Sequence, residues 1–128
     1  MTVTFAELEA KIRAYAELLP DFVYTLDPKP DSWSTSCKYE ADERNPLGCI
    51  VGAAARELWP ETNGFDGRTG SAGSHIHTAM RDGLIEGSDD DRVRVLDWVN
   101  AVQVRQDGGE SWGQAVLSAD AERERRFY

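Results

Sequence analysis

The sequence predicts a mainly α protein: a single compact helical domain of about four to five helices over residues 1–128, with at most a small β-hairpin. In three segments a Ser or Thr stands three positions ahead of an acidic or amide residue, and apolar residues then recur at helical spacing. Proline or glycine ends two of these segments. A chain of 128 residues is also long enough to bury one core without a disulfide or metal.

The first helix is predicted from Phe5 to Leu19. Thr4 and Glu7 form a capping box ahead of it, and Pro20 ends it. The next segment alternates weakly and contains two prolines, so two interpretations stay open. It is either loop or a small hairpin built from residues 22–26 and 36–39.

The stretch NPLGCIVGAAARELW, residues 45–59, predicts a second helix with a cysteine near its start. Asn45 is a favourable N-cap, Pro46 a favoured first helical residue, and Pro60 ends the run. Gly48 and Gly52 lie one turn apart and lower helix propensity, which predicts another element packed closely against that side. The expected apolar face consists of Leu47, Ile50, Val51, Ala54 and Leu58.

Residues 61–74 are rich in glycine and predict a long surface loop. The stretch HIHTAMRDGLI then predicts a short helix that ends near Gly83. Ser88 and Asp91 form the next cap, ahead of a central helix from about Asp89 to Gln106. Its apolar arc is wide enough that the helix is expected to be largely buried, because the arc includes Val93, Leu96, Ala101 and Val104.

Gly108 and Gly109 end the central helix, and Ser111 with Gln114 caps the last one. The short link between the two helices predicts that they are packed neighbours. Asn100 interrupts the most apolar helix. Its side chain either makes a structural hydrogen bond to a loop carbonyl or forms the floor of a small pocket, and both interpretations stay open.

The formal net charge is -9, and this disfavours direct nucleic-acid binding because the chain repels phosphates. The acidic side chains either keep the protein in solution, dock on a basic partner, or mimic nucleic acid. The sequence shows no signal peptide and no membrane segment, so a cytoplasmic protein that does not bind membranes is predicted.

Cys49 lies between two glycines at the start of an apolar run, where a helix start can activate a thiol. Its apolar neighbours favour a core position instead. A zinc site of Cys37, Cys49, His75 and His77 has unsuitable spacing, and a disulfide between the two cysteines is disfavoured in the cytoplasm. We therefore predict no catalytic residues, no metal ligands and no cofactor.

The segments CKYEADERNPLGCIVGAAARELW and VLDWVNAVQVRQDGGESWGQAVLSA resemble parts of uncharacterised small proteins of actinobacteria and their bacteriophages. In those proteins a cysteine precedes a helix with a P-x-C-I-V-G-like pattern, and a late helix ends in a Q-D-G-x-S-W turn. Here Leu47 and Gly48 stand between Pro46 and Cys49. The resemblance implies an origin. It implies no activity and no functional residues.

Small acidic phage proteins often act by binding a host protein, so the expected function is a non-enzymatic interaction module with an unidentified host protein as partner. The alternatives are a small cysteine- or histidine-dependent hydrolase or a small-molecule-binding enzyme, and an acidic DNA mimic. The sequence makes no prediction about homo-oligomers. Candidate interaction residues lie in the glycine-rich loop and at the start of the central helix: Asp66, Arg68, Asp89, Asp90 and Asp91.

Overall fold

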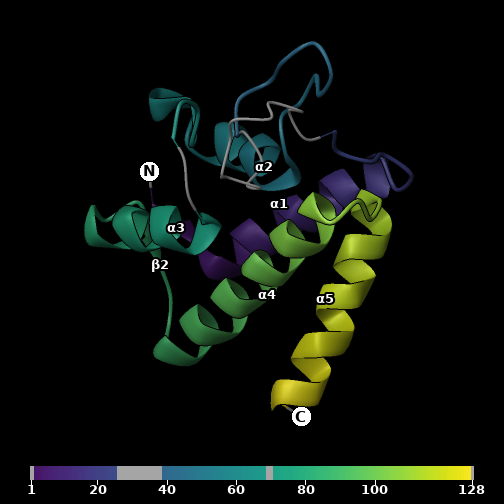
Figure 1. The fold of residues 1–128 in the computed structure, drawn as a ribbon. Helices are drawn as coiled ribbons and strands as arrows, with labels where there is room; N and C mark the ends of the chain where they lie inside the picture. The colour runs from purple at the N-terminus through teal and green to yellow at the C-terminus, as the bar shows by residue number, and fades with distance from the viewer. Residues whose placement is uncertain (1, 26–38, 69–70, 128) are drawn as a thin grey trace.

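The computed structural model describes residues 2–25, 39–68 and 71–127, and it confirms a mainly α fold in one compact domain. The α-helices of the described part are α1 (Phe5–Leu18), α2 (Ile50–Leu58), α3 (Ala72–Arg81), α4 (Asp89–Asp107) and α5 (Trp112–Phe127). A 3-10 turn, η1 (Pro60–Thr62), follows α2. In Figure 1, α4 runs through the middle of the molecule, with α5 beside it and α1 behind.

The predicted start of α1 is confirmed. The Thr4 hydroxyl accepts a hydrogen bond from the Glu7 backbone N–H at 3.1 Å, and the Glu7 carboxylate accepts one from the Thr4 N–H at 3.3 Å. This reciprocal capping box satisfies N–H groups that have no partner inside the helix. The buried face of α1 follows helical spacing and consists of Phe5, Leu8, Ile12 and Ala16.

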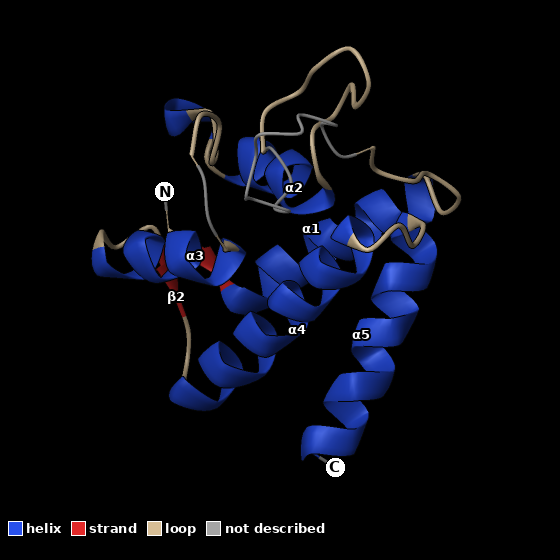
Figure 2. Cartoon of the chain, viewed as in Figure 1, coloured by secondary structure: helices blue, strands red, loops and turns tan. Residues whose placement is uncertain are grey.

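The two short strands are parallel, β1 (Val3–Thr4) beside β2 (Ile85–Glu86), and they tie the start of the chain to the link between α3 and α4 (Figure 2). The predicted hairpin concerns another segment. Of its residues, Val23 makes an isolated antiparallel bridge with Ser111. Residues 26–38 lie outside the described part of the chain, so the hairpin stays a prediction.

α2 begins later than predicted, at Ile50, with Cys49 as its N-cap. Gly48 has a φ of +73°, which is incompatible with a helix, so the run from Pro46 is broken there. Asn45 is buried instead of capping α2. Its side chain accepts from the backbone N–H of Thr25 at 2.9 Å and donates to the Thr25 carbonyl at 2.8 Å.

The predicted close approach at the two glycines of this region is confirmed. A Cβ added at either Gly48 or Gly52 would lie 2.2 Å from the backbone oxygen of Tyr39. Real Cβ atoms do not come that close to another atom, so both positions require glycine. The backbone at Tyr39 therefore packs directly on the start of α2.

The predicted long loop over residues 61–74 is shorter in the structure. η1 takes up its beginning, and α3 starts at Ala72, capped by the Ser71 hydroxyl, so the helix predicted from His75 is longer than expected. Phe65 is 2% exposed and anchors the turn between these elements in the core. Residues 69 and 70 lie outside the described part.

α4 and α5 confirm the predicted central pair, joined by a tight turn at Gly108 and Gly109 and running antiparallel (Figure 1). The expected wide burial of α4 is wrong at Val93 and Val104, which are 44% and 68% exposed. The reason is that neighbouring helices cover one face of α4 and leave the other in solvent. Its buried face centres on Trp98, Val99 and Val102.

Candidate functional site

Three amide side chains on one face of α4 hold the starts of two other helices. Gln106 accepts a hydrogen bond from the backbone N–H of Ile50, the first residue of α2, at 2.8 Å. Gln103 and Asn100 do the same for the first two residues of α3, at 2.9 and 3.0 Å. Asn100 is thus a structural partner, as the first interpretation held, but it binds a helix N–H and not a loop carbonyl. These amides cap the two helices, so the backbone N–H groups that they bind are not available to an anion.

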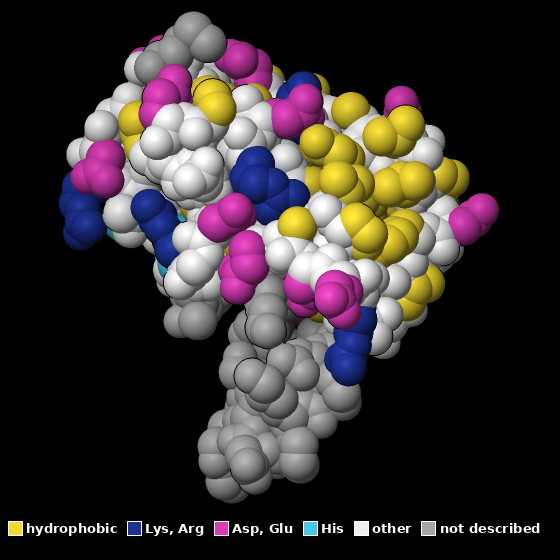
Figure 3. All heavy atoms as spheres, turned by 90° about the horizontal axis from the view of Figure 1, so that it is seen from above, with side chains coloured by type: hydrophobic (Ala, Val, Ile, Leu, Met, Phe, Trp, Pro, Cys, Tyr) yellow, Lys and Arg dark blue, Asp and Glu magenta, His cyan; other side chains and the backbone are white. Residues whose placement is uncertain are grey.

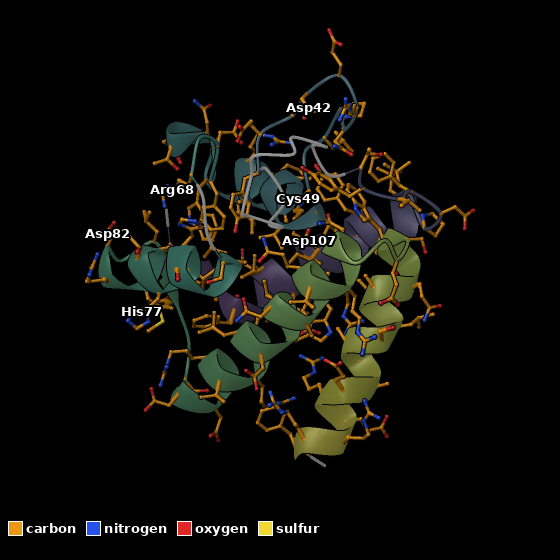
Figure 4. The ribbon with its side chains drawn as sticks, viewed as in Figure 1. Asp42, Cys49, Arg68, His77, Asp82 and Asp107 are labelled. Carbon is orange, nitrogen blue, oxygen red and sulfur yellow. The ribbon has the colours of Figure 1, made fainter. Side chains whose placement is uncertain are left out.

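Cys49 belongs to the core, as predicted, with no exposed surface. It is the N-cap of α2, because the helix begins at Ile50 and not at Pro46. Its sulfur accepts a hydrogen bond from the Gly52 N–H at 3.4 Å. A nucleophile must reach its substrate, and this sulfur lies beneath the surface. Figure 4 shows Cys49 inside the fold, between α2 and the end of α4.

The two histidines have different surroundings. His75 packs its ring against Tyr39 and Phe65, with ring centroids 5.3 and 5.4 Å apart. His77 is exposed on the side of α3 that faces the start of α4 (Figure 4). Over residues 2–25, 39–68 and 71–127 the structure contains no group of three or more His, Cys, Asp or Glu side chains that could hold a metal ion. Cys37 lies outside those residues.

Two arginines and two carboxylates join α1 to α5 around the ring of Trp98. Arg13 makes a two-point contact with Asp120 at 2.6 and 3.0 Å, and Arg123 makes one with Glu9 at the same distances. Arg13 also bonds Glu9 at 2.9 Å, and the Trp98 indole N–H donates to Asp120 at 2.8 Å. Both guanidinium groups lie over the Trp98 ring, at 4.8 and 5.5 Å from its centroid. We call these five residues the ionic network.

The ionic network holds its carboxylates in the charged form. The hydrogen bond from Arg123 lowers the pKa of Glu9, and the contacts with Arg13 add to this, against the opposing effect of burial. Burial by itself raises the pKa of Asp120, but hydrogen bonds from Arg13 and the Trp98 indole outweigh it and lower that pKa overall. Carboxylates with lowered pKa values stay ionised near neutral pH, where they keep both arginines paired.

The predicted interaction residues of the glycine-rich segment are engaged within the fold. Asp66 forms an ion pair with Arg56 at 3.1 Å, and the Arg68 guanidinium lies 5.7 Å from the centroid of the Phe65 ring. Arg56 also donates to the backbone oxygens of Tyr39 and Leu47, so this arginine joins the segments on either side of α2.

Asp89, Asp90 and Asp91 are all exposed in the first turn of α4. Asp89 forms an ion pair with Arg92 at 3.8 Å, and the Ser88 hydroxyl accepts a hydrogen bond from the Asp91 N–H at 3.1 Å. Figure 4 shows Arg68 above α3 and the start of α4 below it. The predicted interaction residues therefore do not form one surface.

An open groove of about 610 Å³ lies between α3 and α4. Its polar lining includes Ser74, His77, Arg92 and Asn100, and its apolar lining is Val93 and Leu96. The side chain of Asn100 already holds the start of α3. The groove is broad and shallow, which suits contact with another surface better than enclosure of a small molecule.

The outer side of α1 is apolar and exposed. Ala10, Ala14 and Leu18 follow one another at four-residue spacing, and Val23 follows in the turn after the helix. Leu18 is 69% and Val23 48% exposed. Figure 3 shows hydrophobic side chains gathered on the side of the molecule where α1 ends, with acidic side chains at the edges. We call these four residues the α1 patch.

The comparisons with known proteins add no relative: no protein-family model, curated protein or solved structure matches the chain.

The α1 patch and the ionic network were not predicted, although each has a signal in the sequence. The alanines and the leucine of the patch repeat every fourth residue on the face opposite the buried face of α1. In the network, Glu9 and Arg13 are four residues apart and Asp120 and Arg123 three, which places each pair on one face of its helix.

Proposed function

We propose that this chain is a non-enzymatic interaction module that binds another protein through the α1 patch. The observation that carries the proposal is the exposure of Leu18 and two alanines on one helix face, followed by exposed Val23 in the next turn. Contiguous apolar surface with a polar rim is typical of protein–protein contacts. The hydrolase alternative lacks such support, because the Cys49 sulfur is buried and the His75 ring packs against two aromatic rings.

The charge around the α1 patch indicates the chemistry of its partner. Over residues 10–25 the charged residues are Lys11, Arg13, Glu17 and Asp21, and the whole chain carries a net charge of -9. Lys11 and Arg13 are paired with carboxylates of the fold: Glu57, Glu9 and Asp120. Opposite potentials across an interface favour association and disfavour wrong partners. The partner is therefore a protein segment with apolar side chains flanked by lysine or arginine.

The setting of this interaction follows from the sequence. The resemblance to proteins of actinobacteria and their bacteriophages makes an actinobacterial host protein the proposed partner and the cytoplasm the proposed compartment. No helix of the described residues combines the length and apolar character needed to cross a membrane. The negative charge supports a partner other than nucleic acid.

The proposal is tested by affinity capture from an actinobacterial lysate with matched leucine variants. Leu18→Ser combined with Val23→Ser should lose a specific protein that the unchanged chain retains. Leu117→Ser is the control, because Leu117 is 63% exposed on α5 and lies outside the patch. Glu17→Gln with Asp21→Asn should weaken retention by about tenfold or less, as expected for charges at the rim of an interface.

Three results would contradict the α1 patch as the binding site. Retention that survives Leu18→Ser with Val23→Ser excludes the patch. Retention lost only when Asp89, Asp90 and Asp91 are changed to Asn places the contact at the start of α4, and displacement of that partner by DNA then indicates a nucleic-acid mimic. A dimer of this chain that Leu18→Ser dissociates makes the patch a contact between copies.

A further inference from the structure

α4 and α5 enclose a cleft that the interaction proposal does not use. The helices pack closely near the turn that joins them, where Gln106 of α4 accepts a hydrogen bond from the indole N–H of Trp112 of α5 at 3.2 Å. They diverge toward the end of α5 (Figure 1). Ala101 and Ala119 line the space between them, and because their side chains are small they leave a cleft of about 330 Å³. Binding sites for small organic molecules begin at about this size.

The cleft has an aromatic floor and rim. Trp98 lies at its base, held in place by the ionic network, and Phe127 lies at its mouth with 36% of its surface exposed. The indole N–H of Trp98 is already donated to Asp120. The base of the cleft therefore offers apolar contacts to a ligand, and the Trp98 ring is held in place by Arg13 and Arg123, whose guanidinium groups lie over it.

More arginines than carboxylates line the cleft. Its walls carry Arg123, Arg125 and Arg126 against the carboxylates of Asp97 and Glu122. Arg123 is bound to Glu9 outside this set, and Glu122 is bound to Arg105. Arg126 pairs with Asp97 at 2.7 Å, whereas Arg125 has no ion pair among the described residues. The wall of α5 thus presents one guanidinium that no carboxylate compensates.

Arg126 can exchange Asp97 for another carboxylate. The Arg126 side chain is 67% exposed and that of Asp97 41% exposed, and ion pairs at such positions add little to stability. A carboxylate entering the cleft would meet Arg125 and Arg126 together, and guanidinium groups bind carboxylates through two parallel hydrogen bonds.

From the aromatic base, the cleft volume and the arginine excess we infer that this cleft binds a small aromatic acid, with the ring between Ala101 and Ala119 and the carboxylate at Arg125 and Arg126. The inference does not depend on a protein partner at the α1 patch.

The test uses 2-naphthoate as the probe and 2-naphthamide as its neutral counterpart. In a two-dimensional NMR titration of the full chain, 2-naphthoate should move the indole N–H signal of Trp98 in a saturable way. The expected dissociation constant is on the order of 1 mM, which is usual for a fragment of this size. The amide should bind about tenfold more weakly or worse, because it lacks the charge that the arginines recognise.

Matched variants locate the probe. Ala101→Leu fills the cleft and should abolish the shift of the Trp98 signal, whereas Ala121→Leu adds the same bulk on the exposed side of α5 and should leave it unchanged. Arg125→Gln with Arg126→Gln alters two exposed side chains and should raise the dissociation constant about tenfold. This second variant keeps the test valid if Ala101→Leu impairs folding.

The inference is wrong if the Trp98 signal does not saturate with 2-naphthoate. It is also wrong if the acid and the amide bind equally, or if Arg125→Gln with Arg126→Gln leaves the dissociation constant unchanged. The protein-capture experiment has a separate readout, so either proposal can fail alone.

Discussion

The side-chain oxygen of Gln106 lies 2.8 Å from the backbone nitrogen of Ile50 and 3.2 Å from the indole nitrogen of Trp112. One buried amide of α4 thus accepts hydrogen bonds from the first residue of α2 and the first residue of α5. Gln106 has no exposed surface, so water does not replace either bond if the amide is lost.

Replacing Gln106 with leucine should therefore lower the free energy of unfolding by about 2–4 kcal/mol, because each buried donor left without an acceptor costs about 1–3 kcal/mol. Urea denaturation monitored by circular dichroism gives this value. The control is Gln114→Leu on the exposed face of α5, which should change stability by less than about 0.5 kcal/mol. Equal losses in both variants would show that Gln106 is not a shared cap.

The distance along the chain between a helix start and the residue that caps it decides whether the start can be predicted from the sequence. α1 and α4 are capped by Thr4 and Ser88, and each cap bonds a residue three positions along the chain, so the pattern is visible locally. α2 begins where Gln106 can reach Ile50, 56 residues away in the sequence. A partner that distant leaves no local pattern. The N-cap of α2, Cys49, does bond Gly52 three positions along the chain, but cysteine is not one of the residues preferred at N-caps, so Asn45 was predicted instead.

The surface is less predictable than the core for a related reason. Apolar residues at helical spacing reveal the buried face of α1, but the alanines and Leu18 on its other side carry the same kind of signal. The structure covers the face of Phe5, Leu8 and Ile12 and leaves the face of Leu18 in solvent. Likewise, the exposure of Val93 and Val104 depends on where α3 and α5 lie against α4, which periodicity does not encode.

Gly52→Ala should destabilise the protein by about 2 kcal/mol or more, because the added methyl group would lie 2.2 Å from the Tyr39 backbone oxygen and must displace it. Gly108→Ala provides the matched control. There the nearest atom lies at 3.4 Å and the φ is −78°, so alanine fits and is expected to leave stability unchanged or raise it by up to about 1 kcal/mol. Thermal melts of both variants measure the difference, and similar melting temperatures would disprove the close contact.

Acid should weaken the ionic network. The pKa values of Glu9 and Asp120 lie below their ordinary values of 4.5 and 3.8 in the folded protein. The unfolded chain therefore binds more protons than the folded one in mild acid, so stability is fully present above those ordinary values and falls as pH drops through the lower folded-state pKa values.

The measurement for this prediction is the free energy of unfolding from pH 7 down to 3, for the unchanged chain and for Glu9→Gln with Asp120→Asn. The stability gap between the two proteins should be largest near neutral pH and shrink below about pH 4.5. Glu17→Gln serves as the control, since Glu17 is exposed on α1 outside the network. A gap that does not depend on pH would mean that the charges of Glu9 and Asp120 do not stabilise the fold.

The thiol of Cys49 should react with a thiol reagent only when the protein opens, because the side chain is fully buried at the start of α2. The experiment uses Cys37→Ser, so that Cys49 is the remaining cysteine of the chain. Labelling at neutral pH should be slow in buffer and accelerate in parallel with unfolding as urea is added. Cys49→Ala should cost about 1–2 kcal/mol, from the lost cap and the cavity left behind, and should not affect retention of a partner by the α1 patch. Rapid labelling of the native protein, together with a hydrolytic activity that Cys49→Ala removes, would instead make Cys49 a nucleophile and overturn the non-enzymatic function.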